Sequence, residues 1–130
     1  MRIEHIALWA RNAEALSDFY QHWFGAERGA RYENPAKGFL SFFLRFTDGA
    51  RLEIMQRDEI HERPAGEAMQ QHLGYAHLAL TAGSEAAVDQ LTARLVAAGI
   101  RCIDGPRRTG DGYYESVILD PEGNRIEITA

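Results

Sequence analysis

Two histidines and two glutamates stand at matching places in two similar stretches of this chain, where together they could hold a metal ion. His5 opens the tetrapeptide His-Ile-Ala-Leu, and 72 residues later His77 opens His-Leu-Ala-Leu. Glu53 lies in Arg-Leu-Glu-Ile, and 74 residues later Glu127 lies in Arg-Ile-Glu-Ile. Imidazole nitrogen together with carboxylate oxygen suits Zn, Ni, Co, Mn or Fe(II), and does not suit an ion that prefers thiolates.

Each of these side chains is predicted to lie on one face of a β-strand whose other face is apolar. Side chains alternate between the two faces of a strand, so His5 is expected on one face and Glu4, Ile6 and Leu8 on the other. A carboxylate on a core strand needs a partner, because unpaired burial of an ion costs several kcal/mol. A metal-free network of His–Glu hydrogen bonds is the alternative, and the matched repetition favours the metal.

The elements that must position these residues form the same series twice. Apolar periodicity predicts a helix over residues 13–24, between the N-cap Asn12 and Gly25, and a second helix between Ser84 and Gly99. Runs rich in aromatic and β-branched residues predict strands at 3–9, 39–46, 51–55, 75–81, 100–103, 113–119 and 125–129.

The order β-α-β-β, a polar stretch, and β-α-β-β-β predicts an α+β fold built from a repeated module. Residues 1–130 are expected to form a single domain of two βαβββ modules, 1–56 and 73–130, joined by a connector at about 57–72. The glycine-containing run 105–112 is predicted to be a mobile loop able to close over a ligand.

Composition excludes several classes of protein. Lys and Arg number 14 against 19 Asp and Glu, a net charge of −5, so a general nucleic-acid binder is not expected. The single cysteine, Cys102, allows no intrachain disulfide and is expected to be a small core residue. Neither a signal peptide nor a membrane span of about 20 apolar residues is recognisable, so a cytoplasmic protein without a membrane partner is expected.

The chain resembles the vicinal oxygen chelate superfamily, which includes glyoxalase I, extradiol dioxygenases and bleomycin-binding proteins. Three features carry the resemblance: the paired modules, the two His-x-Ala-Leu openings, and residues 120–127, which read Asp-Pro-Glu-Gly-Asn-Arg-Ile-Glu. The resemblance implies a cup of strands around one divalent metal, often at the interface of a homodimer. It maps the metal ligands onto His5, Glu53, His77 and Glu127.

A His-Glu-His-Glu ligand set is similar to that of bacterial glyoxalase I, which isomerises the hemithioacetal of methylglyoxal and glutathione. The resemblance implies a lactoylglutathione lyase-like enzyme in which the metal acts as a Lewis acid and a carboxylate moves a proton beside the carbonyl. Glu127 is the expected base and Glu53 the second choice. A small-molecule substrate is expected, with glutathione as a possible cosubstrate.

Two positions depart from the glyoxalase I pattern. Trp9 stands four residues after His5, where glyoxalase I often has an arginine for the glutathione carboxylate, and Arg57 stands four residues after Glu53, where it often has an asparagine. The alternatives are therefore another reaction of the superfamily (extradiol ring opening, epimerisation or thiol transfer) or non-catalytic binding of a small molecule such as an antibiotic.

Overall fold

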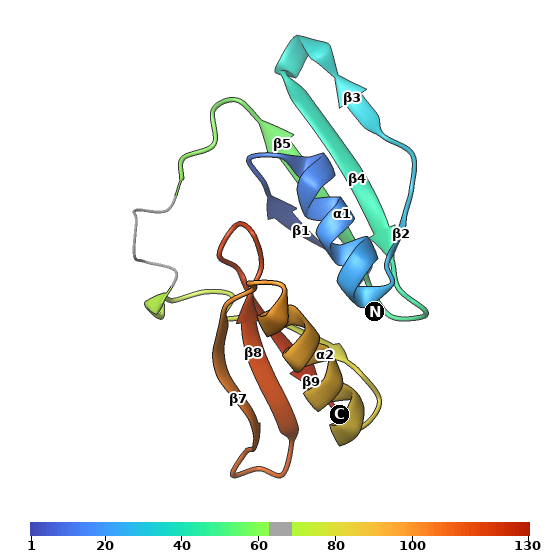
Figure 1. The fold of residues 1–130 in the computed structure, drawn as a ribbon. Helices are drawn as coiled ribbons and strands as arrows, with labels where there is room; N and C mark the ends of the chain where they lie inside the picture. Colours follow the sequence, from blue (N-terminus) through green and yellow to red (C-terminus); the bar gives the residue numbers. More distant parts are fainter. Residues whose placement is uncertain (63–68) are drawn as a thin grey trace. The chain divides into compact units, whose positions relative to one another are not determined.

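The structure, a computed structural model, describes residues 1–62 and 69–130 and divides into two compact units, Met1–Glu62 (unit 1) and Arg63–Ala130 (unit 2). Figure 1 shows that each unit consists of one small sheet and one main helix. Residues 63–68, in the middle of the predicted connector, lie outside the described residues.

Unit 1 is built on a sheet in which the first and last strands are parallel neighbours. β1 (His5–Trp9) runs parallel to β5 (Arg51–Arg57), and β5 pairs antiparallel with β4 (Phe39–Arg45). Two short strands, β2 (Glu27–Arg28) and β3 (Tyr32–Asn34), both pair with β4 at the far edge. The sequence pattern missed β2 and β3 because they are short and polar, as edge strands often are.

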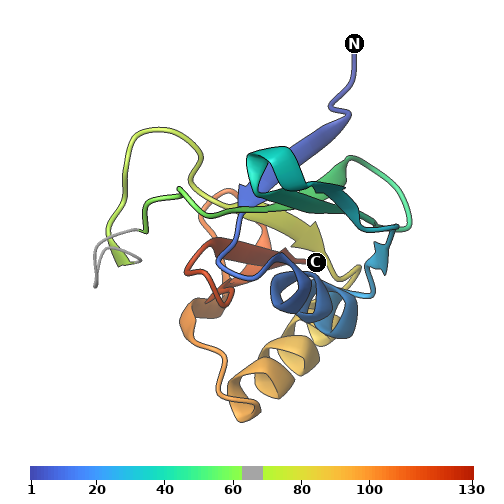
Figure 2. The same ribbon diagram turned by 90° about the horizontal axis from the view of Figure 1, so that it is seen from above.

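Helix α1 (Ala13–Phe24) packs against β4 and β5 and covers one face of this sheet (Figure 2). It begins after Asn12, whose side chain accepts a hydrogen bond from the backbone N–H of Ala15, and it ends at Gly25, which has φ +66°. A short 3₁₀ turn, η1 (Pro35–Lys37), separates β3 from β4. The largest fully buried apolar side chains of unit 1 come from this helix and from β4 and β5, and are Leu16, Tyr20, Leu44, Leu52 and Ile54.

Unit 2 repeats the arrangement. β6 (Leu78–Thr81) runs parallel to β9 (Arg125–Thr129), which pairs antiparallel with β8 (Tyr114–Leu119), and β8 pairs with β7 (Cys102–Arg108). Helix α2 (Glu85–Ala97) packs against β7, β8 and β9 (Figure 1). The α+β fold class, with its two modules, is thus confirmed.

The N-terminus of α2 is capped as the sequence predicts. The side chain of Ser84 accepts a hydrogen bond from the backbone N–H of Ala87, and Gly99, with φ +85°, follows the end of the helix. No helix among the described residues is long and apolar enough to cross a membrane.

The largest differences from the predicted strand boundaries in unit 2 are at the start of β6 and the end of β7. β6 begins at Leu78, which pairs with Ile126, instead of at residue 75. Since β9 begins only at Arg125, residues 75 and 76 have no partner in it, and His77 stands just before the strand. β7 continues to Arg108, so residues 105–108 belong to a strand and only the remainder of the predicted loop is a turn. The ladder between β7 and β8 shifts register between Asp104 and Arg107, which accommodates a glycine and a proline that the sequence pattern assigned to a loop.

The register shift in β7 depends on Gly105. This residue has φ +74°, and a Cβ placed there would stand inside contact distance of the carbonyl oxygen of Glu115 and 3.0 Å from Cα of Ser116. We therefore expect Gly105→Ala to destabilise the protein by more than about 2 kcal/mol in a urea unfolding experiment. Gly110→Ala is the matched control, since a Cβ there meets nothing within 4 Å. Equal losses of stability in the two variants would contradict this account.

Candidate functional site

In unit 1, His5 and Glu53 lie side by side on the sheet face that α1 leaves open. The parallel register pairs His5 with Arg51 and Ala7 with Glu53, so all four side chains share that face. Nε2 of His5 lies 3.8 Å from Oε2 of Glu53, and the side chains are 40% and 15% exposed. The two predicted ligands of the first module are therefore neighbours.

In unit 2, His77 and Glu127 form the corresponding pair. Ala79 is opposite Glu127 in the parallel ladder, just as Ala7 is opposite Glu53. Nε2 of His77 lies 3.2 Å from Oε2 of Glu127, and the side chains are 43% and 17% exposed. The late start of β6 thus leaves His77 in contact with its glutamate.

Both pairs are chemically suited to hold a divalent cation. Ligand nitrogen and oxygen atoms bind such an ion at about 2.1 Å, so two adjacent ligands of one ion lie roughly 3 to 3.5 Å apart. The 3.2 Å separation in unit 2 is within this range, and the 3.8 Å separation in unit 1 is slightly longer. Within the described residues, no cluster of three or more His, Cys, Asp or Glu side chains could hold a metal ion. The four predicted ligands thus come together as two pairs, one in each unit.

Glu4 orients the imidazole ring of His5. Nδ1 of His5 donates a hydrogen bond to Oε2 of Glu4, and the other oxygen of Glu4 accepts one from Nη2 of Arg51. The hydrogen bond from His5, assisted by Arg51, lowers the pKa of the Glu4 carboxyl group. Since a carboxylate only accepts hydrogen bonds, the ring proton is on Nδ1, and Nε2 presents its lone pair beside Glu53.

The sequence pattern placed Glu4 on the face opposite His5, and this prediction was wrong. Glu4 precedes β1, so the alternation of a paired strand does not govern its side chain, which instead contacts both His5 and Arg51. An acidic residue directly before a candidate histidine ligand was the only signal in the sequence. In unit 2 the corresponding residue is Ala76, and Arg125 donates to the backbone carbonyl of Met69 at 2.9 Å.

Glu115 is a site residue that the sequence interpretation missed. It lies on β8, and its carboxyl group hydrogen-bonds to Glu127 on the neighbouring strand. Burial raises the pKa of Glu115, and the charge of Glu127 and the hydrogen bond between them raise it further. Nη2 of Arg107 lies 3.8 Å from Oε1 of Glu115 and partly offsets this effect. The signal in the sequence was a glutamate inside an apolar strand, two positions from Val117, which is opposite Glu127.

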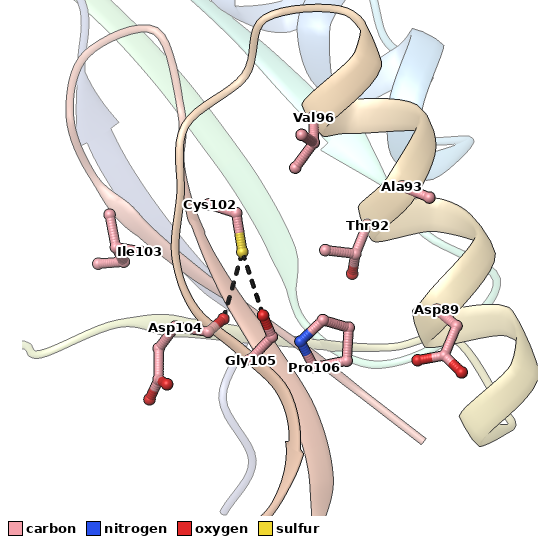
Figure 3. A pocket seen from close by; sticks show the side chains of 9 residues that line it. All are labelled: Asp89, Thr92, Ala93, Val96, Cys102, Ile103, Asp104, Gly105 and Pro106. Carbon is pink, nitrogen blue, oxygen red and sulfur yellow. Dashed lines mark hydrogen bonds between the residues drawn. The ribbon is translucent and has the colours of Figure 1, made fainter.

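A pocket of about 500 Å³ lies between α2 and β7, and none of its lining residues belongs to either His–Glu pair (Figure 3). Cys102 lines this pocket and is half-buried, and its Sγ hydrogen-bonds to the carbonyl oxygens of Asp104 and Gly105 at 3.3 and 3.7 Å. Cys102 thus lies at the wall of this pocket and not in the buried core, where the sequence interpretation places it. The pocket is formed by the helix side of the module, whereas the His–Glu pairs occupy the open sheet faces.

The tautomer of His5 can be tested in the metal-free protein. Near neutral pH, proton–nitrogen correlation NMR should show the ring proton of His5 on Nδ1, because Glu4 accepts it there. Glu4→Ala should convert His5 to a mixture of both tautomers. Glu62→Ala, which removes an exposed carboxylate bound to Arg11 in the same unit, should leave the His5 signals unchanged. A ring proton on Nε2 in the unaltered protein would refute the assignment.

The comparison with protein families agrees with the fold and with the repeated pairs. Residues 2–128 match the family model described as the Glyoxalase/Bleomycin resistance protein/Dioxygenase superfamily. The chain therefore belongs to this superfamily, and the resemblance seen in its sequence is confirmed.

Individual relatives span almost the whole chain. YqjT of Bacillus subtilis, an uncharacterized protein, is 33% identical over 132 residues and is matched over 98% of both chains. The crystal structure of a glyoxalase family protein from Enterococcus faecalis is 26% identical, with a TM-score of 0.77 over 98% of this chain and 96% of that one. Lactoylglutathione lyase from Agrobacterium tumefaciens is also 26% identical, with a TM-score of 0.68 over 98% and 91% of the two chains.

Proposed function

We propose that this protein is a divalent-metal-dependent enzyme of the glyoxalase I type, a lactoylglutathione lyase-like carbon–sulfur lyase that moves a proton between adjacent carbons. The observation that supports this most strongly is the presence of one His–Glu pair in each unit, in the same register and on the same open face. The structural likeness to a lactoylglutathione lyase agrees with it. We further propose that the two units, with the connector, form one glyoxalase-like domain.

The proposed ligands of the metal are His5, Glu53, His77 and Glu127, two from each unit. The superfamily generally uses a divalent metal, and the nitrogen and oxygen donors here suit Ni, Zn, Co, Mn or Fe(II). A bound ion would supply a Lewis acid beside the substrate carbonyl. The hydrogen bond from His5 to Glu4 supports this role for His5, because histidine ligands commonly donate their second ring proton to a carboxylate.

Glu127 is the base that we assign to the proton transfer, and Glu53 is the second candidate. Both carboxylates are mostly shielded from water, because the Glu127 side chain is 17% exposed and the Glu53 side chain 15%. Each could therefore take a proton from one carbon of the substrate and return it to the next without exchanging that proton with water. Glu127 alone of the two has a second carboxyl group, Glu115, hydrogen-bonded to it. This contact orients the carboxyl group of Glu127.

Metal analysis tests the ligand set and the function together. After reloading with Ni, Zn, Mn or Fe(II), the unaltered protein should contain about one divalent ion per chain by mass spectrometry and should convert the hemithioacetal of methylglyoxal. The His77→Ala variant should lose nearly all of the bound metal and nearly all of the activity. Its circular dichroism spectrum should stay the same, because the His77 side chain is exposed. His22→Ala, which alters an exposed histidine on α1, is the control.

Either of two results would overturn the proposal. Full metal occupancy in His77→Ala would remove this histidine from the ligand set. No stoichiometric metal under any loading would leave two hydrogen-bonded His–Glu pairs and would favour a non-catalytic protein that binds a small molecule. Oxygen consumption with catechols and Fe(II), without turnover of the hemithioacetal, would instead favour ring opening.

We propose a homodimer as the working form, and sedimentation analysis should find two chains per particle at micromolar concentration.

Mixing equal amounts of His5→Ala and His77→Ala chains then shows whether each site lies within one chain or between two chains. If each site combines unit 1 of one chain with unit 2 of its partner, the mixed dimers regain one intact site and activity returns to about a quarter of the original. No recovery would place each site within one chain, and a monomer would contradict the proposal.

A further inference from the structure

The open face of the sheet in unit 1 carries a row of aromatic side chains on the same face as the His–Glu pair. Register places Trp9 opposite Met55, Phe39 opposite Arg57 and Tyr32 opposite Ser41, all on the face of Glu53. The rings of Tyr32 and Phe39 are 6.1 Å apart between centroids, and those of Phe39 and Trp9 are 6.3 Å apart. We refer to Tyr32, Phe39 and Trp9 as the aromatic row.

The aromatic row is not part of the buried core. Tyr32 is 57% exposed and Trp9 is 40% exposed, whereas the core of this unit is formed on the opposite face of the sheet, under α1. The repeated module does not require the row either, because Thr81 of β6 corresponds to Trp9 of β1. Exposed aromatic side chains grouped on one face are typical of a binding surface.

Arg57 places a positive charge at the end of this row. Its guanidinium carbon lies 5.7 Å from the centre of the Trp9 ring, and within the described residues Arg57 forms no ion pair. The other arginine on this face of β5, Arg51, is already bound to Glu4 and lies over Phe43. Arg57 is therefore the guanidinium on β5 that can bind a carboxylate of a ligand.

Trp9 and Arg57 are also the two positions at which the chain departs from the glyoxalase I pattern, and the structure shows that they contact each other. Each stands four residues from a proposed ligand, His5 or Glu53, which is roughly 13 Å along an extended strand. The long side chain of Arg57 can shorten this distance. A ligand that spans from the His–Glu pair to Arg57 across the aromatic row is about one to two rings long.

We infer that the open face of unit 1 binds a flat aromatic carboxylate, with its ring on the aromatic row and its carboxylate on Arg57. This inference concerns a binding surface beside the proposed metal site and goes beyond the proposed function, so the two are tested separately. A ring is bound by the exposed faces of Trp9 and Tyr32, and the negative charge of the carboxylate matches the positive charge of the Arg57 guanidinium. Glutathione, a flexible peptide without an aromatic ring, would leave the row uncovered.

Ligand binding to the full chain tests the inference, with 2-naphthoate as probe and its uncharged amide, 2-naphthamide, as the comparison. Titration calorimetry on metal-free protein should show at least about tenfold tighter binding of the acid, because a hydrogen-bonded charge pair is worth that much. Arg57→Gln should abolish the preference for the acid, and Trp9→Thr should weaken both probes about tenfold. The control variant Arg101→Gln, at an exposed arginine in unit 2, should leave the binding of 2-naphthoate and of 2-naphthamide unchanged.

The outcomes separate this inference from the proposed function. Tighter binding of reduced glutathione than of 2-naphthoate, or a preference for the acid that survives Arg57→Gln, would overturn the inference, even if the protein binds metal and converts the hemithioacetal. Binding of 2-naphthoate through Arg57 in a protein that never binds metal would support the inference and overturn the proposed function. Failure of both probes to bind would overturn the inference alone.

Discussion

Each module depends on the parallel pairing of its first and last strands. β1 pairs with β5, and β6 pairs with β9, although about 45 residues separate the partners in sequence. The connection between parallel strands must cross the sheet, and α1 and α2 occupy that crossover on one face. The opposite face of each sheet therefore stays free of that module's helix. There the histidine at the start of the first strand contacts the glutamate of the last strand.

The two units share this framework but differ in what surrounds their His–Glu pairs. In unit 1, Glu4 and Arg51 hold the far side of the His5 ring, and no acidic residue takes the place of Glu4 before His77. In unit 2, Glu115 brings a second carboxyl group to Glu127, whereas Ser41 occupies the corresponding position beside Glu53. The two modules thus supply equal sets of His and Glu side chains, which differ in the side chains that contact them.

Membership of the superfamily accounts for the paired strands and their His–Glu pairs. It does not determine the substrate, which depends on residues outside these pairs. The repeated His–Glu pairs follow from strand pairing that both modules share. The strand pairing that both modules share does not require Trp9 or Arg57. These two residues add aromatic surface and positive charge to the open face of unit 1. Relatives with the same fold can therefore differ in substrate through changes at these strand ends.

The sequence by itself determined the modules, both helices with their caps, most strands and the four candidate ligands. These features depend on local periodicity, on capping residues such as Asn12 and Ser84, and on the repeat, all of which are visible along the chain. The boundaries of β6 and β7 depended instead on where a partner strand begins or shifts register, which no local pattern contains.

Only the tertiary structure decided the contacts between residues far apart in sequence. It placed Glu4 on Arg51, Glu115 on Glu127 and Arg57 over Trp9, because strand register, and not spacing along the chain, selects which side chains meet.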